Sequence, residues 1–285
     1  MPEGTLYLVG TPIGNLGDIS FRALETLKDA AIIAAEDTRH TKKLLNHFEI
    51  NTQLISYHQH NARERSQQLL EKLRAGQDVA LVSDAGMPAI SDPGFVIVAE
   101  AVANGLRVAP IPGPSASLAA LVVSGLPTDR FVFEGFLPRK KEEVKKRLQA
   151  LLDEDRTIII YEAPHRIIKT LALCVEYLGA ERRAVIAREL TKKFEEILRG
   201  TLGELEDILA KRDIKGEFCL IIGGNLAAAD KRETAWWENI TTDEQIKLLI
   251  NRGYTTNNAI KETARERGLP KREVYAQYHQ QNDKE

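Results

Sequence analysis

Apolar and polar positions along the chain follow two different periods. Seven short runs rich in β-branched residues are apolar on both faces, which is typical of buried strands: 6–9, 31–35, 79–82, 108–111, 158–161, 185–187 and 218–222. Between them, apolar residues spaced three and four apart predict helices over 21–28, 63–75, 95–104, 141–152, 167–178 and 202–211. Strands that alternate with helices predict an α/β fold built on parallel sheets that helices cover.

The runs fall into two groups, which predicts two lobes. Four lie within residues 1–112 and three within about 130–224, and the stretch Ile111-Pro112-Gly113-Pro114-Ser115 separates them. Clustered proline and glycine mark a break in regular structure, so we place an N-terminal α/β lobe at 1–115 and a second α/β lobe at 116–226.

The last part of the chain has a different composition. No strand-like run follows Gly223-Gly224, and we expect a small all-helical module over 235–285. Within it, an amphipathic segment at 256–264, a turn containing Gly268 and a second segment starting near Pro270 have a helix-turn-helix outline.

Composition narrows the class of protein. With 43% hydrophobic and 28% charged residues the chain can bury ordinary cores, and its net charge of −2 does not indicate a nucleic-acid partner. Cys174 and Cys219 are too few for a disulfide scaffold or a four-cysteine zinc site. The N-terminus lacks the pattern of a signal peptide, and no apolar stretch approaches the ~18 residues of a membrane span. We therefore expect a reduced, cytoplasmic protein.

The residues that follow each strand carry the chemical information, because ligands of open α/β sheets bind beyond the carboxyl ends of the strands. Glycine-rich and proline-rich loops there suit a nucleoside-like ligand. Gly10, Gly14 and Gly17 have neither the dinucleotide fingerprint nor the phosphate-loop spacing, which disfavours NAD and ATP. The alternative for any single loop is a tight turn that requires glycine.

Taken in order, these loops resemble the ribosomal RNA small subunit methyltransferase I family, a branch of the tetrapyrrole-methylase superfamily. The motifs that carry the resemblance are G-T-P-I-G-N-L-G-D-I (10–19), A-E-D-T-R (35–39), S-D-A-G-M-P-A-I-S-D-P-G (83–94), P-I-P-G-P-S-A (110–116), Y-E-A-P-H-R (161–166), R-E-L-T-K (188–192) and K-G-E (215–217). The resemblance covers nearly the whole chain. It implies two α/β lobes with a cofactor cleft between them, a homodimer, and methyl transfer from S-adenosyl-L-methionine to the ribose 2′-hydroxyl of cytidine 1402 in the 16S rRNA of the small ribosomal subunit.

The resemblance also implies cofactor-binding residues. Carried over motif by motif, they are Pro12, Ile13, Asp84, Gly86, Met87, Pro88, Ile90, Ser115, Ala116, Tyr161, Glu162, Ala187, Arg188 and Glu217. Tetrapyrrole-type members typically have G-D-P where this chain has A-G-M-P, so Met87 stands in place of an aspartate and can offer only apolar or backbone contact. Asp84 has two interpretations: it contacts the cofactor, or it accepts hydrogen bonds from neighbouring loop amides.

A ribose hydroxyl must lose its proton when it is methylated, and a carboxylate or a neutral amine can accept that proton. The candidate catalytic residues are Glu36, Glu189 and Lys192, and the hypothesis is that Glu36 or Glu189 accepts the proton while Arg39 and Arg166 hold phosphate or a carboxylate partner. The alternative is that Glu36, Asp37 and Arg39 only cap the next helix and pair with one another.

Two local clusters of basic residues could bind RNA despite the even total charge. Segments 139–147 and 252–272 each carry six basic against two acidic residues, a local charge of +4. The residues we assign to RNA are Arg139, Lys140, Lys141, Lys261, Arg265, Lys271 and Arg272, together with Arg39 and Arg166. A solvated helix face is the alternative for the first cluster, and dimer packing is the alternative for the second.

The remaining motifs favour structural roles. Trp236-Trp237 could stack on bases, but we expect them to anchor the C-terminal module. His58 and His60 are expected in a surface or substrate loop, because metal sites need three or four ligands, and we expect no metal. Two other functions remain open: methylation of a tetrapyrrole or another small molecule, and a non-catalytic RNA-binding module.

Overall fold

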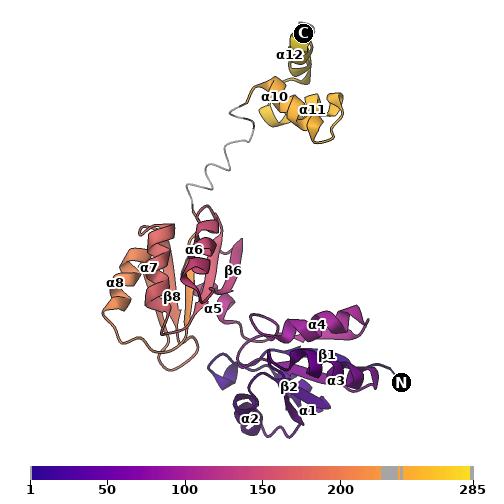
Figure 1. Ribbon diagram of the computed structural model, residues 1–285, viewed down its shortest axis with the longest axis vertical. Coiled ribbons are helices and arrows are strands. Elements are labelled where there is room, and N and C mark those ends of the chain that lie inside the picture. Colours follow the sequence, from indigo (N-terminus) through magenta and orange to yellow (C-terminus); the bar gives the residue numbers. More distant parts are fainter. Residues whose placement is uncertain (1, 226–236, 238–239, 283–285) are drawn as a thin grey trace. The chain divides into compact units, whose positions relative to one another are not determined.

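The computed structural model describes residues 2–225, 237 and 240–282 (Figure 1). The chain divides into two compact units, Met1–Asn225 and Leu226–Glu285, which are described separately. The predicted domain boundaries at 226 and 235, and Trp236, lie outside the described residues.

The first unit begins with an all-parallel sheet in the order β3-β2-β4-β1-β5. Its strands are β1 (Thr5–Val9), β2 (Ile32–Ala35), β3 (Leu54–Ser56), β4 (Val79–Val82) and β5 (Arg107–Ile111). The connecting helices are η1 (Leu16–Asp18), α1 (Phe21–Asp29), α2 (Thr38–His47), α3 (Ala62–Arg74) and α4 (Gly94–Ala103). The sheet lies within the predicted lobe 1–115.

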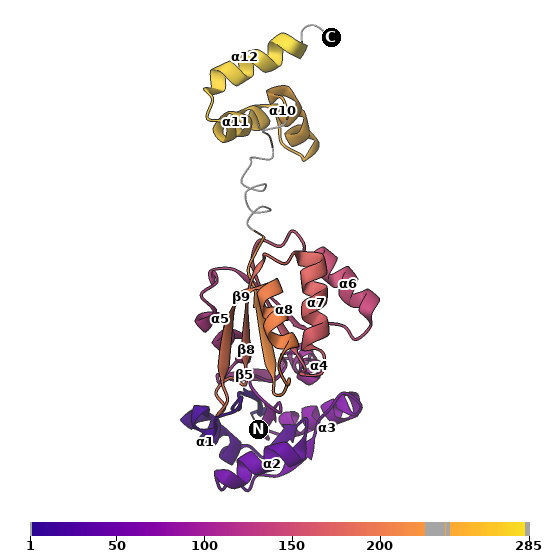
Figure 2. The ribbon, with the colours of Figure 1, turned by 90° about the vertical axis from the view of Figure 1, so that its left-hand side faces the viewer.

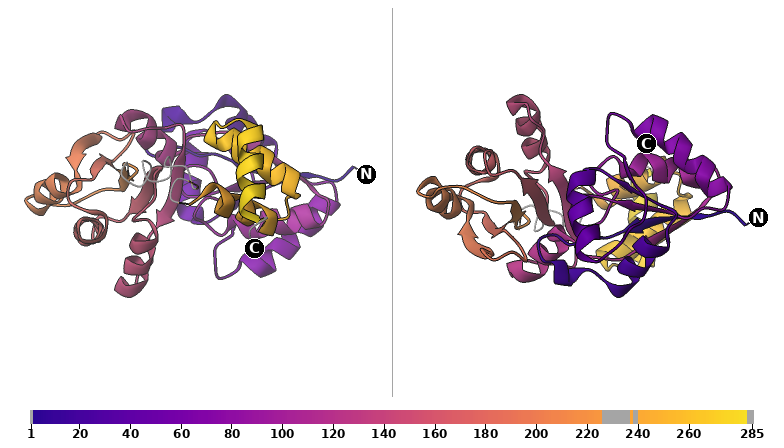
Figure 3. Two further views of the ribbon diagram at one scale, coloured as in Figure 1. Left: turned by 90° about the horizontal axis from the view of Figure 1, so that it is seen from above. Right: turned by 90° about the horizontal axis from the view of Figure 1, so that it is seen from below.

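Helices cover both faces of this sheet (Figure 3). Leu27 of α1 and Leu45 of α2 pack with Ile33 and Val82 on one face. Helices α3 and α4 cover the other face. Because both faces are buried, β2 and β4 are apolar at every position, which is why their strands could be predicted.

The second sheet is mixed, in the order β6-β7-β10-β8-β9. Its strands are β6 (Phe131–Phe136), β7 (Thr157–Glu162), β8 (Arg183–Arg188), β9 (Glu196–Thr201) and β10 (Phe218–Ile222), and its helices are α5 (Ala116–Ser124), α6 (Lys141–Ala150), α7 (Ile167–Leu178) and α8 (Leu202–Ala210). Figure 2 shows α5 on one side of the sheet and α7 and α8 on the other, in agreement with the two apolar cores.

The expectation of parallel sheets is wrong for this second lobe. Only β6 and β7 pair in parallel, while β10 runs antiparallel to both β7 and β8 and β9 runs antiparallel to β8. An apolar run reports burial on both faces and not strand direction, so β10 has the same pattern as its neighbours. Its reversed direction brings Phe218 beside Glu162 and Arg188, at the edge where β7 and β8 end.

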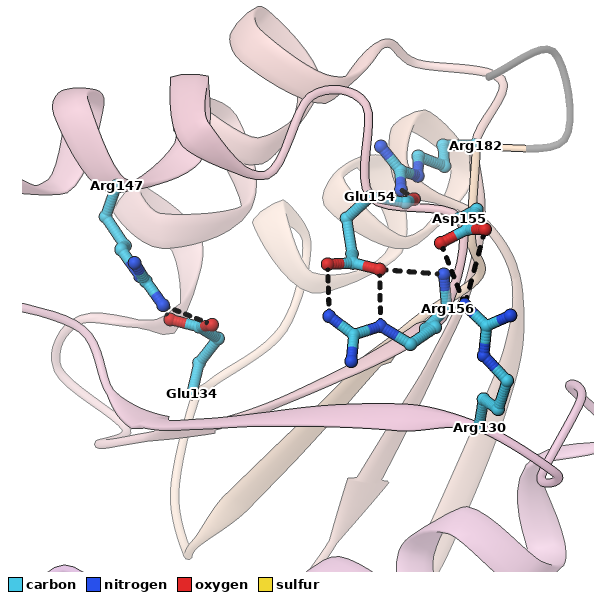
Figure 4. Close-up of polar contacts among 7 residues, drawn as sticks. All are labelled: Arg130, Glu134, Arg147, Glu154, Asp155, Arg156 and Arg182. Atoms are coloured by element: carbon cyan, nitrogen blue, oxygen red, sulfur yellow. Dashed lines mark hydrogen bonds and ion pairs between the residues drawn. The ribbon is translucent and has the colours of Figure 1, made fainter. Parts of the chain in front are cut away.

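Ion pairs join the strands and helices of this lobe away from the apolar cores (Figure 4). Arg147 of α6 lies 2.5 Å from the carboxylate of Glu134 in β6, whose side chain is only 4% exposed. Arg156 pairs with Glu154 at 2.8 Å. The nearly buried Arg182 donates to three backbone carbonyls, of Leu152, Glu154 and Gly223.

The second unit holds three helices, α10 (Thr242–Asn251), α11 (Thr256–Arg267) and α12 (Lys271–Asn282). Thr241 forms a capping box with Glu244 at the start of α10, and Gly268 ends α11 with a φ of 65°. Ile246, Ile260 and Val274 form a small core between the helices. The expected helix, glycine-containing turn and second helix are all present.

Candidate active site

The loops that leave the carboxyl ends of the strands line one cavity of about 480 Å³. The first sheet contributes the loops after β1, β2 and β4, and the second contributes residues at the ends of β7 and β8 and at the start of β10. Its lining consists of Ile13, Glu36, Ser83, Asp84, Ala85, Gly86, Met87, Ile90, Ser91, Asp92, Ser115, Ala116, Phe136, Tyr161, Glu162, Ala163, Pro164, Ala187, Leu190, Glu217, Phe218 and Cys219.

The loop after β4 is folded around Asp92. Its Oδ1 accepts hydrogen bonds from the N–H groups of Ala89 at 2.9 Å and Gly94 at 2.7 Å. Ala89 and Ser91 have φ values of 67° and 62°, a conformation that costs energy for residues other than glycine. Strain held in this way by a buried carboxylate is typical of a loop whose shape matters for ligand binding.

Close backbone contact ties the other loops to it. Gly86, with a φ of 78°, exchanges two backbone hydrogen bonds with Thr11, of 2.9 and 3.1 Å. A Cβ on Gly10 would lie 2.7 Å from the Cα of Gly113 and from the sulfur of Met87, so only glycine fits there. Met87 therefore offers an apolar surface at this point.

The second lobe contributes side chains that are held in place. The hydroxyl oxygen of Tyr161 accepts the N–H of Ser117 at 2.9 Å, which ties β7 to the first turn of α5. Glu162 is 2% exposed, and its carboxylate accepts the Thr170 hydroxyl at 2.6 Å and lies 3.3 Å from the guanidinium of Arg166. The carboxylate of Glu162 is thus fully engaged by the protein.

The lining is acidic. It includes five carboxylates and no lysine or arginine: Glu36, Asp84, Asp92, Glu162 and Glu217. Burial raises the pKa of Glu36, and the negative charges of Asp84 and Asp92 raise it further. Burial likewise raises the pKa of Asp92, whose Oδ2 is buried without a hydrogen-bond partner among the described residues. Such a cavity favours a cationic ligand and opposes phosphate groups.

Glu189 and Lys192 lie beside this cavity and not in its wall. The ammonium of Lys192 lies 2.9 Å from Glu189 and 3.1 Å from Glu217. Burial raises the pKa of Glu189, but the hydrogen bonds from Lys192 and from the Glu217 N–H outweigh burial and lower this pKa. Burial lowers the pKa of the Lys192 ammonium, but the carboxylates of Glu189 and Glu217 outweigh burial and raise this pKa. Neither group is therefore shifted towards the pKa of an effective general base.

The residues of the motif 36–39 have two different roles, one at the start of α2 and one in the cavity wall. Asp37 caps α2 by accepting the N–H of Arg39 at 2.8 Å, and its carboxylate pairs with the Arg39 guanidinium at 3.1 Å. The hydrogen bond from the Arg39 side chain lowers the pKa of Asp37 to about 2. Capping and mutual pairing therefore describe Asp37 and Arg39, whereas Glu36 lies in the cavity wall.

Asp84 combines its two interpretations. Its Oδ1 accepts the N–H of Asp37 at 2.9 Å, and the side chain is an exposed part of the cavity lining. It also lines a smaller hollow of about 320 Å³, which contains Pro12, His40, Lys43 and Lys192 and shares Ser83 with the cavity.

The residues assigned to RNA in 139–147 lie on a face whose charge is partly neutralised. Lys140 pairs with Glu143, Lys145 with Glu142, and Arg147 with Glu134. Arg139 and Lys141 line a wide hollow between α6 and α7, where the described residues offer them no ion-pair partner. Arg166 donates to the backbone carbonyls of Leu137 and Pro138, so its guanidinium is largely used within the fold.

In the second unit, Lys261, Arg265, Lys271 and Arg272 are exposed, and Arg265 pairs with Glu262. Arg267 has a structural role: its guanidinium lies 4.9 Å from the centre of the Trp237 ring and donates to the carbonyl of Ile240. Trp237 thus anchors this unit. Within the described residues no group of three His, Cys, Asp or Glu side chains could hold a metal ion, and the rings of His58 and His60 lie 6.0 Å apart.

The structure brings most of the expected cofactor residues together. Ile13, Asp84, Gly86, Met87, Ile90, Ser115, Ala116, Tyr161, Glu162, Ala187 and Glu217 lie in the cavity wall, and Pro12, Pro88 and Arg188 do not. Sequence reasoning missed Asp92, Phe136 and Phe218. Asp92 could have been found from the sequence, because an aspartate before Pro-Gly commonly marks the start of a helix.

The chain is similar to known proteins along nearly all of its length. The family model of the Tetrapyrrole (Corrin/Porphyrin) Methylases matches residues 5–206. A Halalkalibacterium halodurans protein named ribosomal RNA small subunit methyltransferase I is 50% identical over 279 residues, covering 98% of this chain and 96% of that protein. A Bacillus subtilis protein of the same name is 49% identical over 276 residues, covering 97% and 94%. The chain belongs to the ribosomal RNA small subunit methyltransferase I family.

Membership in this family makes the chain an S-adenosylmethionine-dependent methyltransferase, as the sequence motifs predicted. A crystal structure of uroporphyrin-III C-methyltransferase from Thermus thermophilus, complexed with S-adenyl homocysteine, has a TM-score of 0.54 and 20% identity and covers 77% of this chain and 97% of that one. It confirms the predicted fold. The helices α10, α11 and α12 lie beyond the residues that the methylase model matches, but within the length that the two relatives share. No described helix is long and apolar enough to cross a bilayer.

Proposed function

We propose that this chain methylates the ribose 2′-hydroxyl of a cytidine, position 1402, in the 16S rRNA of the small ribosomal subunit, with S-adenosylmethionine as methyl donor. The observation that carries the chemistry is the cavity with five carboxylates and no cationic side chain. The RNA substrate is supported by the names of relatives about 50% identical to this chain. We place the reaction in the cytoplasm, where the ribosomal subunits are.

The residues present fit the methyl donor. It carries a sulfonium and an ammonium against one carboxylate, so its net positive charge suits an acidic lining. Phe136, Tyr161 and Phe218 supply aromatic surface for an adenosine, and Ile13 and Met87 add apolar surface. Bound there, the donor supplies a methyl group made electrophilic by the positively charged sulfur.

Glu36 is the residue that we propose as proton acceptor. The ribose oxygen forms a bond to the methyl carbon as the carbon–sulfur bond breaks, and the hydroxyl proton moves to the Glu36 carboxylate. Its raised pKa makes Glu36 a stronger base than an ordinary glutamate. Glu189 and Lys192 act as positioning residues, because their ion pairs and the bond from the Glu217 N–H to Glu189 at 2.9 Å fix Glu217 at the cavity wall.

The target nucleotide enters through the smaller hollow. This hollow shares Ser83 and Asp84 with the cavity, so the two lie side by side. In-line methyl transfer requires that the ribose hydroxyl and the methyl donor occupy neighbouring sites. Lys43 supplies positive charge there for the phosphates. The exposed cations Lys261, Lys271 and Arg272 of the second unit supply further RNA contacts.

We propose that the chain acts as a homodimer. Exposed apolar side chains occur on α4, α5 and β6, among them Phe95 at 63%, Val122 at 71% and Phe136 at 56% exposed. Gly135 of β6 approaches Ser91 in the loop before α4, so β6 and the start of α4 are close together. Large exposed apolar side chains on these two neighbouring elements, Phe95 and Phe136, favour a protein interface, and a second copy is the partner that the family resemblance implies.

The experiment that tests the function is incubation with S-adenosylmethionine labelled in its methyl group and small ribosomal subunits that lack the modification. We expect label in 2′-O-methylcytidine after nucleoside digestion, mapped to one position. Label on a base, or transfer only to small molecules such as tetrapyrroles, would overturn the proposal. Binding of RNA without any binding of the donor would favour a non-catalytic RNA-binding role instead.

A further inference from the structure

We propose that a groove along helix α2 binds the RNA backbone on one side of the target nucleotide, through Lys42 and Arg65. This inference rests on the proposed RNA substrate and assigns residues that neither motifs nor charge clusters indicated. The groove measures about 690 Å³ and lies between α2, strand β3 and the first turn of α3. It is lined by Thr38, Arg39, Lys42, Leu45, Asn46, Ile50, Asn51, Thr52, Leu54, Ile55, Ser56 and Arg65.

The charge of the lining is the first argument. It contains Arg39, Lys42 and Arg65 and no carboxylate, which is the reverse of the cavity. Residues Thr38–His47 include two lysines, an arginine and two histidines without an acidic residue. Among the described residues, Lys42 and Arg65 have no ion-pair partner, and Arg65 only donates to the neutral Gln68. Uncompensated cations in a groove attract phosphates.

The shape of the groove is the second argument. Arg39, Lys42 and Asn46 lie three and four residues apart, so they occupy one face of α2. The opposite wall is β3, an edge strand of the first sheet, with the polar side chain of Ser56, and Asn51 lies in the segment before this strand. Cations on one wall and hydrogen-bonding groups on the other suit a single strand, whose phosphates and riboses need both.

The position of the groove is the third argument. Thr38 and Arg39 directly follow Asp37, whose N–H donates to Asp84 in the cavity wall. At the same edge of the sheet, Ser56 pairs with Ala35, the residue before Glu36. The groove therefore starts beside the proposed acceptor site and follows α2, which lies at the bottom of Figure 1. The other face of α2 presents His40 and Lys43 to the smaller hollow.

The test compares Lys42→Ala/Arg65→Ala with a matched control, Arg74→Ala/Arg107→Ala, in the full chain. Arg74 and Arg107 are exposed in the same lobe, at the opposite edge of the sheet, and line none of these hollows. Affinity for an unmodified rRNA fragment containing the target is measured by fluorescence anisotropy from ~50 to 300 mM salt. Methyl transfer to small subunits and donor binding by calorimetry are measured in parallel.

We expect the groove variant to bind RNA about 5- to 30-fold more weakly than the wild type. The slope of log Kd against log salt concentration should fall by about 1–2, because two phosphate contacts are lost. The RNA affinity of the control variant should stay within ~2-fold of the wild type. The groove variant's defect in methyl transfer should appear in KM, with donor affinity unchanged. Equal RNA affinity and slope in both variants would overturn the groove while wild-type methylation keeps the function intact. A defect on assembled subunits alone would indicate a ribosomal protein and also overturn the RNA assignment. Failure of the wild type to methylate or bind RNA would refute the proposed function, and the groove with it.

Discussion

Two hollows of the first unit lie within a few residues of each other and have opposite charge. The cavity contains five carboxylates and no lysine or arginine, and the α2 groove contains three cations and no carboxylate. The boundary between them falls at Glu36, Asp37, Thr38 and Arg39, where β2 passes into α2. The proposed donor site and the proposed RNA site therefore differ in charge, and the net charge of −2 averages over both.

Replacement of the charge at the centre of the acidic cavity should have the largest effect. We expect Glu36→Gln to lower kcat by about 10²- to 10⁴-fold, because glutamine cannot accept the proton. Because Glu36 ionises less readily in the folded chain than in the unfolded chain, its charge disfavours the fold at pH values above its raised pKa, and the variant should melt at a higher temperature than the wild type. Turnover at saturating RNA and thermal melting check this, and an active variant or a melting point that falls would contradict it.

The pH profile tests the same residue in the wild type. A proton acceptor must be ionised, so kcat should fall as the pH falls through the raised pKa of Glu36, above the ordinary value of 4.5. The acid limb should disappear from the residual activity of Glu36→Gln. An unchanged acid limb in the variant would assign that limb to another group.

Loss of the second unit should affect RNA and spare the donor. We expect a chain that ends at residue 225 to bind RNA about 10- to 100-fold more weakly near 100 mM salt, because the exposed cations of α11 and α12 are gone. Donor affinity, measured by calorimetry, should be unchanged because the described lining of the cavity, from Ile13 to Cys219, belongs to the first unit. Equal RNA affinity at several salt concentrations would assign the unit to another role.

A smaller effect separates charge from shape in the cavity. Asp84→Asn keeps the size of the side chain and removes one negative charge, so we expect binding of S-adenosylmethionine to weaken about tenfold, or ~1.4 kcal/mol. Binding of S-adenosylhomocysteine, which lacks the sulfonium charge, should weaken less. Asp18→Asn, at an acidic residue outside the lining, is the control, and equal losses for both ligands would argue against recognition of the charge.

The smallest effect should come from a basic residue that is already paired. Arg147→Ala should change RNA affinity by less than ~2-fold, because its guanidinium lies against Glu134. Its consequence should instead be a lower Tm, since the buried Glu134 carboxylate loses its partner. A loss of RNA affinity comparable to that of the α2 groove variant would show that paired cations matter as much as unpaired ones.

The fold could be predicted where burial alone decides the pattern. Strands β2, β4 and β10 are apolar throughout, whereas β3 has three residues and β6 and β9 are only partly buried, so these three were missed. The direction of the strands in the second sheet cannot be predicted from the pattern of apolar residues, because parallel and antiparallel buried strands share that pattern. The site was predicted where a motif follows a strand. The acidic charge of the cavity could not be predicted, because its lining collects residues from distant segments between Ile13 and Cys219. The charge of a cluster such as 139–147 could not be predicted either, because it depends on Glu134, which lies outside the cluster.

The antiparallel strand β10 also determines the order in which the molecule can be completed. The first sheet is finished at Ile111, so it can form while the rest of the chain is still being synthesised. The second sheet cannot form so early, because its central strand is β10, which lies between β7 and β8. This strand, Phe218–Ile222, is the last of the sheet to be synthesised. A nascent chain of some 200 residues thus has one finished lobe and one without its middle, and the cavity, which needs Glu217 and Phe218, does not yet exist. If this cavity is the donor site as proposed, the enzyme binds its methyl donor only after nearly the whole of the first unit has left the ribosome.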